Sequence, residues 1–343
     1  MDTILYLTDV QPDGSLSRVS LEAFQGALAL AGKISGAKLF AGLIGEKVQD
    51  AANLLASAKV EKFIAVTGED FSKSRYSSDA FAAELLAKEV KATIIIAPSN
   101  SRFQRAIPGV NQRLGGCVDT HVTGLDYAEG KLKIQRWYYR QRMMATLARA
   151  ARPWSLLVES GVYPAFSGAT GAASIEILNP ALPDKFKRTT VKGVKSASSG
   201  TNTIKPDSKL LFVAGAGWTK KQGDGQPHVK EAEDLILGFL NKAQASLGSS
   251  KSLVDQGGEG HGVMSFMSHL NQVGQTGATP RHAKGLSTCC HGEEPHVVGW
   301  RFINERRAVN LDANCGWAQG KADVLYVADA FKVMEKVNEL LAK

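Results

Sequence analysis

Six residues from Gln272 to Gly277 have the composition of a ligand-binding loop. Gly274 and Gly277 flank an amide and a hydroxyl in the order Gln-Val-Gly-Gln-Thr-Gly. The glycines let the backbone approach a bound molecule closely, and the Gln275 amide and the Thr276 hydroxyl can form hydrogen bonds. A polar turn without a ligand would have the same composition, so a six-residue string leaves both interpretations open.

A second glycine-rich turn, Gly215-Ala216-Gly217, follows the apolar run of residues 210–214. Such a turn can direct the backbone toward a phosphate at the N-terminus of the next helix, where unpaired N–H groups and the helix dipole favour an anion. The turn lacks the third glycine of a dinucleotide-binding fingerprint. A plain connection from a strand to a helix explains it equally well.

Cysteines and histidines gather in the C-terminal part of the chain, which raises the question of a metal site. They are His282, Cys289, Cys290, His291, His296 and Cys315. No CxxC pair is present, and two adjacent cysteines on a strand would point to opposite faces. We therefore expect buried thiols and a loop here, and no metal.

Basic and aromatic side chains are mixed between Arg136 and Arg142, and such a mixture can stack on bases and neutralise phosphates. No nucleic-acid-binding module accompanies it, so we expect an amphipathic strand with a solvated or partner-facing edge, and no nucleic-acid partner. The sequence also has no nucleophile elbow, Walker A or HExxH motif. The hydrolase and kinase templates therefore have no residues to match.

The composition is that of a folded globular protein, with 44% hydrophobic and 22% charged residues among 343. A formal net charge of +8 suits an acidic partner or a phosphate-bearing ligand. All apolar runs are far shorter than the roughly 20 residues that span a bilayer, so we expect no membrane insertion. The irregular spacing of four cysteines and the lack of a signal peptide after Met1 predict a cytoplasmic location.

Short apolar runs alternate with helical patterns through the first half of the chain. We expect strands at residues 4–8, 38–44, 62–66 and 93–97, and helices near residues 20–35, 48–58 and 78–89. This alternation predicts an α/β fold with a mixed, mostly parallel sheet and helices on both faces. Further strands at residues 118–125, 131–137, 143–147 and 154–158 predict an antiparallel extension of that sheet.

The composition changes between about Asn179 and Ser208, where Pro, Lys, Ser, Thr and Gly replace the apolar pattern. We therefore expect two domains, at residues 1–190 and 209–343, joined by a linker at residues 191–208. An α/β pattern then restarts. Its expected strands are at residues 210–214, 253–254, 308–310 and 324–327, and its expected helices at residues 229–245 and 330–341.

Taken in order, these segments resemble the alpha subunit of electron transfer flavoprotein over nearly the whole chain, in a divergent bacterial-type form. Residues 272–277 are similar to its complete QVGQTG signature, and residues 247–255 resemble its GxSRxxVD segment. Residues 285–287 and 296–299 resemble the two ends of its GISGAIQH segment. Weaker similarities join residues 136–146 to RPVYGGKALAT, residues 308–312 to AINxD, and residues 322–333 to AD followed by DxFKV.

The resemblance implies a Rossmann-like C-terminal domain that binds FAD and an N-terminal domain that contacts a partner subunit. It places a loop at the flavin ring and ribityl chain, made of Val273, Gly274, Gln275, Thr276 and Gly277. It also places His296 beside the pyrimidine-side carbonyl of the flavin. The phosphates and the adenosine end would be held by Ser250, Ser287, Asn310 and Asp329.

Several residues depart from the family pattern. The family arginine over the flavin ring is Lys251 here, which keeps the charge but loses the planar fork. The arginine of the family's GRG turn is Ala216. Residues 288–295 are longer than the family's segment and contain His291, a rival to His296 for the role beside the flavin. The family's PxLYIAVG strand is replaced by residues 280–285, which makes the chain a divergent member. From the change at Lys251 we expect a shifted flavin potential.

The resemblance implies a redox carrier rather than a substrate-converting enzyme. Its partners would be a beta subunit, which can hold AMP or a second FAD, an FAD- or FMN-dependent catabolic dehydrogenase, and a quinone-linked oxidoreductase leading to the respiratory quinone pool. One alternative is a diverged alpha-type subunit with weak or lost flavin binding that acts mainly in partner docking. Another is a nucleotide-binding enzyme that uses the same scaffold for different chemistry.

Overall fold

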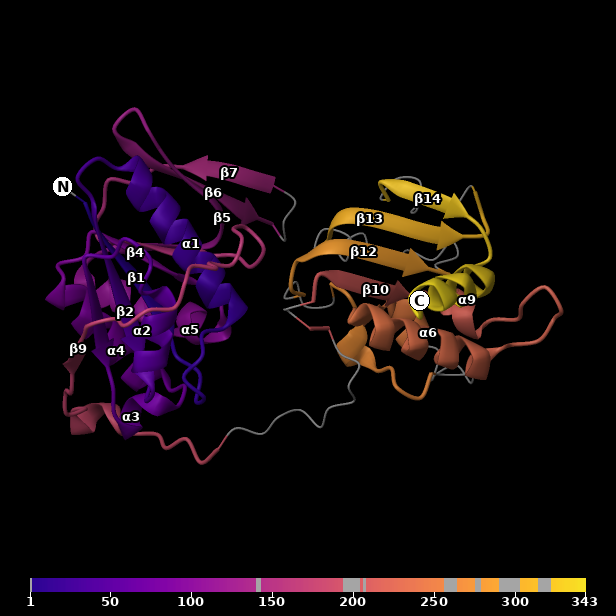
Figure 1. Ribbon diagram of the computed structural model, residues 1–343, viewed down its shortest axis with the longest axis horizontal. Coiled ribbons are helices and arrows are strands. Elements are labelled where there is room, and N and C mark those ends of the chain that lie inside the picture. The colour runs from indigo at the N-terminus through magenta and orange to yellow at the C-terminus, as the bar shows by residue number, and fades with distance from the viewer. Residues whose placement is uncertain are drawn as a thin grey trace. The chain divides into compact units, whose positions relative to one another are not determined.

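The computed structural model describes residues 2–139, 143–193, 204–205, 208–255, 264–274, 279–289, 303–313 and 322–343. The chain divides into two compact units, Met1–Lys195 and Ser196–Lys343 (Figure 1). No helix in the described ranges is long and apolar enough to cross a membrane.

The first unit contains a nine-stranded sheet in the order β7-β6-β5-β8-β4-β1-β2-β3-β9. Its strands are β1 (Thr3–Asp9), β2 (Lys38–Ile44), β3 (Lys62–Val66), β4 (Ile94–Pro98), β5 (Cys117–Ala128), β6 (Lys131–Tyr138), β7 (Met143–Leu147), β8 (Trp154–Val158) and β9 (Ile175–Leu178). Its helices are α1 (Arg18–Lys33), α2 (Val48–Leu55), α3 (Glu69–Ser72), α4 (Tyr76–Glu89) and α5 (Ser101–Leu114), with a short 3-10 turn at Asp184–Phe186.

Helices cover both faces of this sheet, and the alternation of side chains along β1 explains why. Ile4 and Tyr6 pack with α1 and α2 in one hydrophobic core, while Leu5 and Leu7 pack with α4 and α5 in another. A strand that is buried on both faces reads as a continuous apolar run, which is the pattern seen in the sequence. The expected α/β fold, with a mostly parallel sheet covered on both faces, is therefore confirmed.

The predicted antiparallel extension is correct for three strands and wrong for the fourth. β5, β6 and β7 pair antiparallel, but β8 lies between β4 and β5 and is parallel to both. All five residues of β8 are buried, as expected of a parallel strand covered on both faces. The sequence analysis also missed α5, because this helix contains Pro108 and is amphipathic with few apolar residues.

A bulge interrupts β5 at His121, where the backbone φ is 56° and the pairing with β8 shifts between Asp119 and Val122. The bulge brings Nδ1 of His121 to 2.5 Å from Oε1 of Glu159, which follows β8. This hydrogen bond raises the pKa of His121 above its usual value, although burial opposes the shift.

We expect Glu159→Gln to return the pKa of His121 toward its usual value. Because the folded pKa is raised, the pair stabilises the first unit below the pKa of an unfolded histidine, near 6.5, and this stabilisation is lost as the pH rises through the folded value. Equilibrium unfolding near pH 5.5 and near pH 9 tests this prediction. The wild-type protein should have a larger free energy of unfolding than the variant at the lower pH, and this difference should shrink at the higher pH. A difference that is equal at both pH values would contradict this account.

The second unit contains a five-stranded parallel sheet in the order β11-β10-β12-β13-β14. Its strands are β10 (Leu210–Ala214), β11 (Ser246–Ser249), β12 (His282–Thr288), β13 (Ile303–Asn310) and β14 (Val324–Val327). The helices described for it are α6 (Val229–Ala243), α7 (Lys251–Asp255) and α9 (Ala330–Leu340), with 3-10 turns at Ala216–Thr219 and His269–Asn271. This is the doubly wound order 2-1-3-4-5, in which the direction of strand addition reverses at the first strand.

One expectation for the second unit is wrong. Leu253 and Val254 lie in helix α7, because the Ser250 hydroxyl accepts a hydrogen bond from the Leu253 amide and begins the helix there. The strand beside β10 is instead β11. Strand β12, which pairs with β10 and β13, was not predicted, because exposed residues such as Lys284 interrupt its apolar pattern.

Candidate functional site

The carboxyl ends of the five strands of the second sheet meet along one edge, which we call the carboxyl edge. Ala214 at the end of β10 pairs with Ser249 of β11 and with Thr288 of β12, and Asn310 of β13 pairs with Val327 of β14. In open parallel sheets, ligands bind outside these strand ends, at the point where the strand order reverses. That point is at β10 and its two neighbours.

Ser250 and Lys251 lie where the chain leaves β11 at this edge. The Ser250 amide donates to the Ala214 carbonyl at 2.8 Å, and the Ser250 side chain is buried. Lys251 is the first residue of α7, and its side chain is 55% exposed with Nζ 3.7 Å from Oδ2 of Asp255. Among the described residues, the Lys251 ammonium is held only by this long, solvated ion pair, which leaves it available to an incoming anion.

The start of the QVGQTG segment lies directly beside Ser250, although more than twenty residues separate them in the sequence. The Val273 amide donates to the Ser249 carbonyl at 3.1 Å, and the Val273 side chain is buried with Leu211 and Ile303. Gly274 has a φ of 79°, and its amide donates to the Thr279 hydroxyl at 2.8 Å. A positive φ suits glycine, so this turn explains why the motif has one here.

Ser249 was not singled out by the sequence analysis. Its side chain is 1% exposed, and its hydroxyl has no hydrogen-bond partner among the residues that the structure describes. A buried hydroxyl without a partner is costly in a folded protein and is usually explained by strain, by water or by a ligand. Together with the open turn at Gly274, this orphaned hydroxyl makes the end of β11 fit a polar, nucleotide-like ligand.

Asn310 and Asp329 lie at the ends of the two outer strands, as neighbours along the edge. Asn310 is the last residue of β13, and its carbonyl accepts a hydrogen bond from the Ala328 amide at 3.1 Å. Asp329 caps α9 by accepting a hydrogen bond from the Phe331 amide at 2.9 Å. Ser287 differs, because it is buried within β12 and the last residue of that strand is Thr288.

The remaining predicted site residues lie outside the described residues. They are Gln275, Thr276, Gly277 and His296, together with the rival His291. Of the six side chains considered for a metal, His282 and Cys289 are described and the other four are not. Of the predicted site residues, those that the structure describes along one edge are Ser250, Lys251, Val273, Gly274, Asn310 and Asp329.

The Gly215–Gly217 turn does not lead to a helix N-terminus. It opens the 3-10 turn at Ala216–Thr219, and α6 begins only at Val229. The connection from β10 to α6 therefore runs through this 3-10 turn and the residues that follow it. The same turn places Trp218, which sequence reasoning missed, with its indole Nε1 donating to the Thr288 hydroxyl at 2.8 Å.

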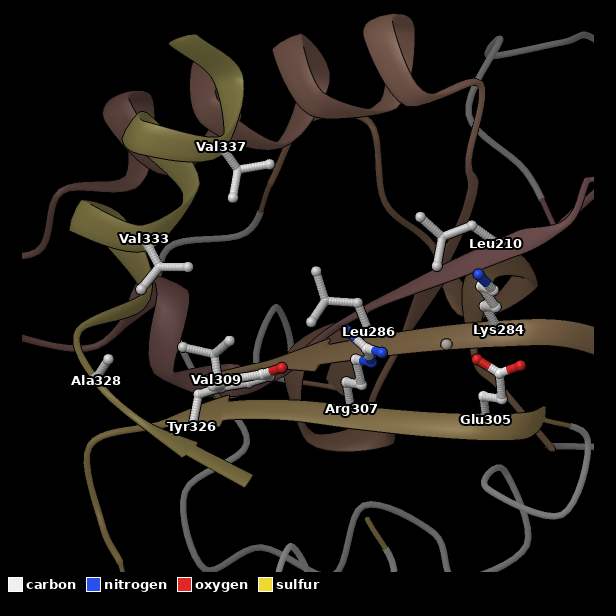
Figure 2. A pocket seen from close by; sticks show the side chains of 11 residues that line it. Leu210, Lys284, Leu286, Glu305, Arg307, Val309, Tyr326, Ala328, Val333 and Val337 are labelled. Atoms are coloured by element: carbon white, nitrogen blue, oxygen red, sulfur yellow. The ribbon is translucent and has the colours of Figure 1, made fainter. Parts of the chain in front are cut away.

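A cavity of about 470 Å³ lies on one face of the second sheet, between the strands and α9 (Figure 2). Its apolar lining includes Leu286 and Val333, and Lys284, Glu305 and Arg307 project into it from β12 and β13. None of the predicted site residues that the structure describes lines this cavity, which was not anticipated from the sequence.

Comparisons with known proteins agree with the resemblance found in the sequence. Residues 4–185 match the family model described as the electron transfer flavoprotein domain. The chain is 26% identical over 338 residues to the electron transfer flavoprotein subunit alpha of Thermoanaerobacterium thermosaccharolyticum, covering 97% of this chain and 96% of that protein. It is 25% identical over 325 residues to Protein FixB of Clostridium saccharobutylicum, covering 93% of this chain and 88% of that protein.

Proposed function

Because this chain belongs to the electron transfer flavoprotein family, we propose that it is the FAD-binding alpha subunit of a heterodimeric electron carrier. It accepts electrons from one or more catabolic dehydrogenases and passes them toward the respiratory quinone pool through a quinone-linked oxidoreductase. The observation that carries this proposal is the carboxyl edge, where Ser250 and Gly274 lie side by side with an orphaned Ser249 hydroxyl. We further propose that the second unit, at residues 209–343, is the FAD-binding domain.

In this proposal the protein binds and orients the flavin, and the flavin supplies one- and two-electron transfer. The turn at Gly274 and the loop residues that follow it would hold the ring and ribityl side of the cofactor, and Ser250 would hold its phosphates. Asn310 and Asp329 would hold the adenosine side, because they lie further along the same edge. The Lys251 ammonium would provide positive charge toward the ring.

The distribution of charge supports a separate role for the first unit. Residues 1–195 contain 25 basic and 18 acidic residues, whereas residues 196–343 contain 16 and 15. Nearly all of the +8 net charge therefore belongs to the first unit. We propose that this unit binds the beta subunit, and that it favours partners with acidic surfaces through long-range attraction.

The second candidate is a diverged alpha-type subunit that docks partners without retaining FAD. Lys251 and Ala216 favour it, because the first replaces a planar guanidinium and the second removes a cation. Ala216 is fully buried, so the chain has no side chain there that could reach a cofactor.

Replacing Lys251 by alanine is expected to lower the flavin midpoint potential by about 30–60 mV, because a nearby cation stabilises the reduced, negatively charged ring. Lys251→Arg should keep the charge and hold the potential at or above the wild-type value. The control is Lys230→Ala, since that side chain is 79% exposed and pairs with Asp234. Spectroelectrochemical titration checks these values, and an unchanged potential in Lys251→Ala would place Lys251 away from the ring.

The test of the proposed function is a visible absorption spectrum of the chain purified together with its beta-type subunit, with any released cofactor identified by mass. About one FAD per heterodimer that can be reduced stepwise without oxygen supports the carrier. A colourless, folded complex that does not take up added FAD would contradict it and favour the docking role.

A further inference from the structure

Trp218 lies at the centre of the carboxyl edge, in one segment of it, and contacts two others. The residue belongs to the loop after β10, and its side chain is fully buried. Its indole Nε1 donates to the hydroxyl of Thr288, the last residue of β12, at 2.8 Å. Its ring packs against Phe331, in the first turn of α9, with 4.6 Å between ring centroids. One side chain thus joins the ends of β10 and β12 to the start of α9.

The segment that Trp218 holds contains a strained residue. Cys289, directly after Thr288, has a φ of 56°, a conformation that is unfavourable for a residue with a Cβ. Such conformations persist when the surrounding structure fixes them, and they gather where the chain direction matters for function. Here the Gly217 amide donates to the Cys289 carbonyl at 2.9 Å, and the Cys289 amide donates to the Val309 carbonyl at 3.2 Å. The loop that carries Trp218 therefore fixes how the chain leaves β12.

The position of this loop matters because it lies where the strand order reverses. The Gly215 amide donates to the Thr288 carbonyl at 2.8 Å, so the loop after β10 is bonded directly to the end of β12. Asp329, which caps α9, precedes Phe331 by two residues. The contacts of Trp218 therefore connect the middle of the edge with the residues proposed for the adenosine side.

We propose that Trp218 is a positioning residue for the flavin, an inference that rests on the proposed function. It makes no contact with the cofactor in this account. Its indole N–H holds the end of β12 and its ring holds the start of α9, so that the edge is ordered before FAD binds. A site that is ordered in advance avoids the entropy loss of becoming ordered on binding, so loosening it weakens affinity.

The test measures FAD affinity and flavin-free stability in Trp218→Phe and Thr288→Val. Thr288→Val removes the acceptor of the indole hydrogen bond with little change in shape, whereas Trp218→Phe removes the donor together with part of a buried ring. Trp154→Phe is the matched control for Trp218→Phe, because Trp154 is also fully buried and donates from Nε1 to Asp119 at 2.9 Å in the first unit. All three variants should lose stability, and the two tryptophan variants should lose more than Thr288→Val, since each also leaves a cavity in a core.

We expect both second-unit variants to bind FAD about 3–10-fold more weakly, which is the change that one buried hydrogen bond can produce. The double variant should bind FAD as well as the more weakly binding single variant does, because both changes remove the same hydrogen bond. Amide hydrogen exchange at Gly217 should become faster in flavin-free Trp218→Phe. Trp154→Phe should bind FAD within about twofold of wild type despite its lost stability.

Two results would overturn the inference in different ways. If Trp218→Phe bound FAD with wild-type affinity while the Gly217 amide exchanged faster, the contacts of Trp218 would order the edge without positioning the cofactor. Equal weakening in Trp154→Phe would mean that the effect follows overall stability. A wild-type complex that binds no FAD would instead overturn the proposed function, and the positioning role with it.

Discussion

Replacing Asp119 by asparagine is expected to lower the free energy of unfolding of the first unit by about 3–5 kcal/mol, because the change removes the charge of a fully buried carboxylate that Arg136 and Arg149 share. The Asp119 carboxylate is fully buried. Its Oδ1 accepts from Arg136 at 2.8 Å and from Arg149 at 3.0 Å, and its Oδ2 accepts from Arg149 and from Trp154 Nε1 at 2.9 Å. This one group ties β5, β6, β8 and the loop before β8 together.

The pH dependence of this effect follows from the pKa of Asp119. Burial alone would raise it, but the hydrogen bonds from Arg149, Arg136 and Trp154 outweigh burial and hold it below its usual value. A lowered pKa stabilises the fold above the unfolded value, near 3.9, and this stabilisation is lost as the pH falls through the folded value. The deficit of the variant should therefore be constant near neutral pH and should shrink below about pH 4.

The matched control is Asp126→Asn, because Asp126 pairs with Lys33 at 2.7 Å but is exposed. Exposed pairs contribute little, so this variant should unfold like wild type. Urea unfolding followed by far-UV circular dichroism measures both variants. A loss below about 1 kcal/mol for Asp119→Asn would show that the two arginines find other partners or water.

Replacing Gly248 by alanine is expected to disturb both the stability of the second unit and its affinity for FAD. A Cβ at this position in β11 would lie 2.4 Å from Cγ2 of Val273 and 3.3 Å from the Phe212 carbonyl oxygen. Overpacking of this kind costs about 1–3 kcal/mol. The strain pushes on Val273, which leads into the proposed flavin loop, so we expect FAD binding to weaken by at least about tenfold.

The control for this variant is Gly223→Ala, where an added Cβ meets no atom within 4 Å and the backbone φ is not in the left-handed region. It should leave FAD binding unchanged. Thermal unfolding and FAD titration measure both variants in parallel. If Gly248→Ala lost stability but kept wild-type affinity for FAD, a shift of Val273 would not affect the flavin site, which would contradict this prediction.

Strands β1 to β4 could be predicted from the sequence because each is a short apolar run buried on both faces. β2 and β3 have the bounds that their runs predict. The position of β8 could not be predicted in this way, because whether a run pairs parallel or antiparallel depends on where the chain crosses the sheet. In the second unit, β12 was hidden by its exposed residues, such as Lys284, which interrupt the apolar pattern.

The candidate site could be predicted in part, because a sequence motif shows residue types and their spacing but not the contacts that the fold creates. The QVGQTG and GSSK segments stand out because they combine glycines with polar side chains, and the fold places Val273 beside Ser249. Trp218 carries no such pattern, because its importance comes from Thr288 and Phe331, which are about 70 and 113 residues away. Ser249 stands out only once its burial without a partner is known.

The measurement that most directly tests a flavin at the carboxyl edge of the second sheet is amide hydrogen exchange of the purified complex, with FAD bound and after its removal. We expect FAD to slow amide exchange at Lys251 and Asp312, which follow the ends of β11 and β13, and at Gly274, which lies beside the end of β11. Exchange in the first-unit loops after β1 and β4 should not change. Protection confined to the first unit, or none in the second, would contradict this account.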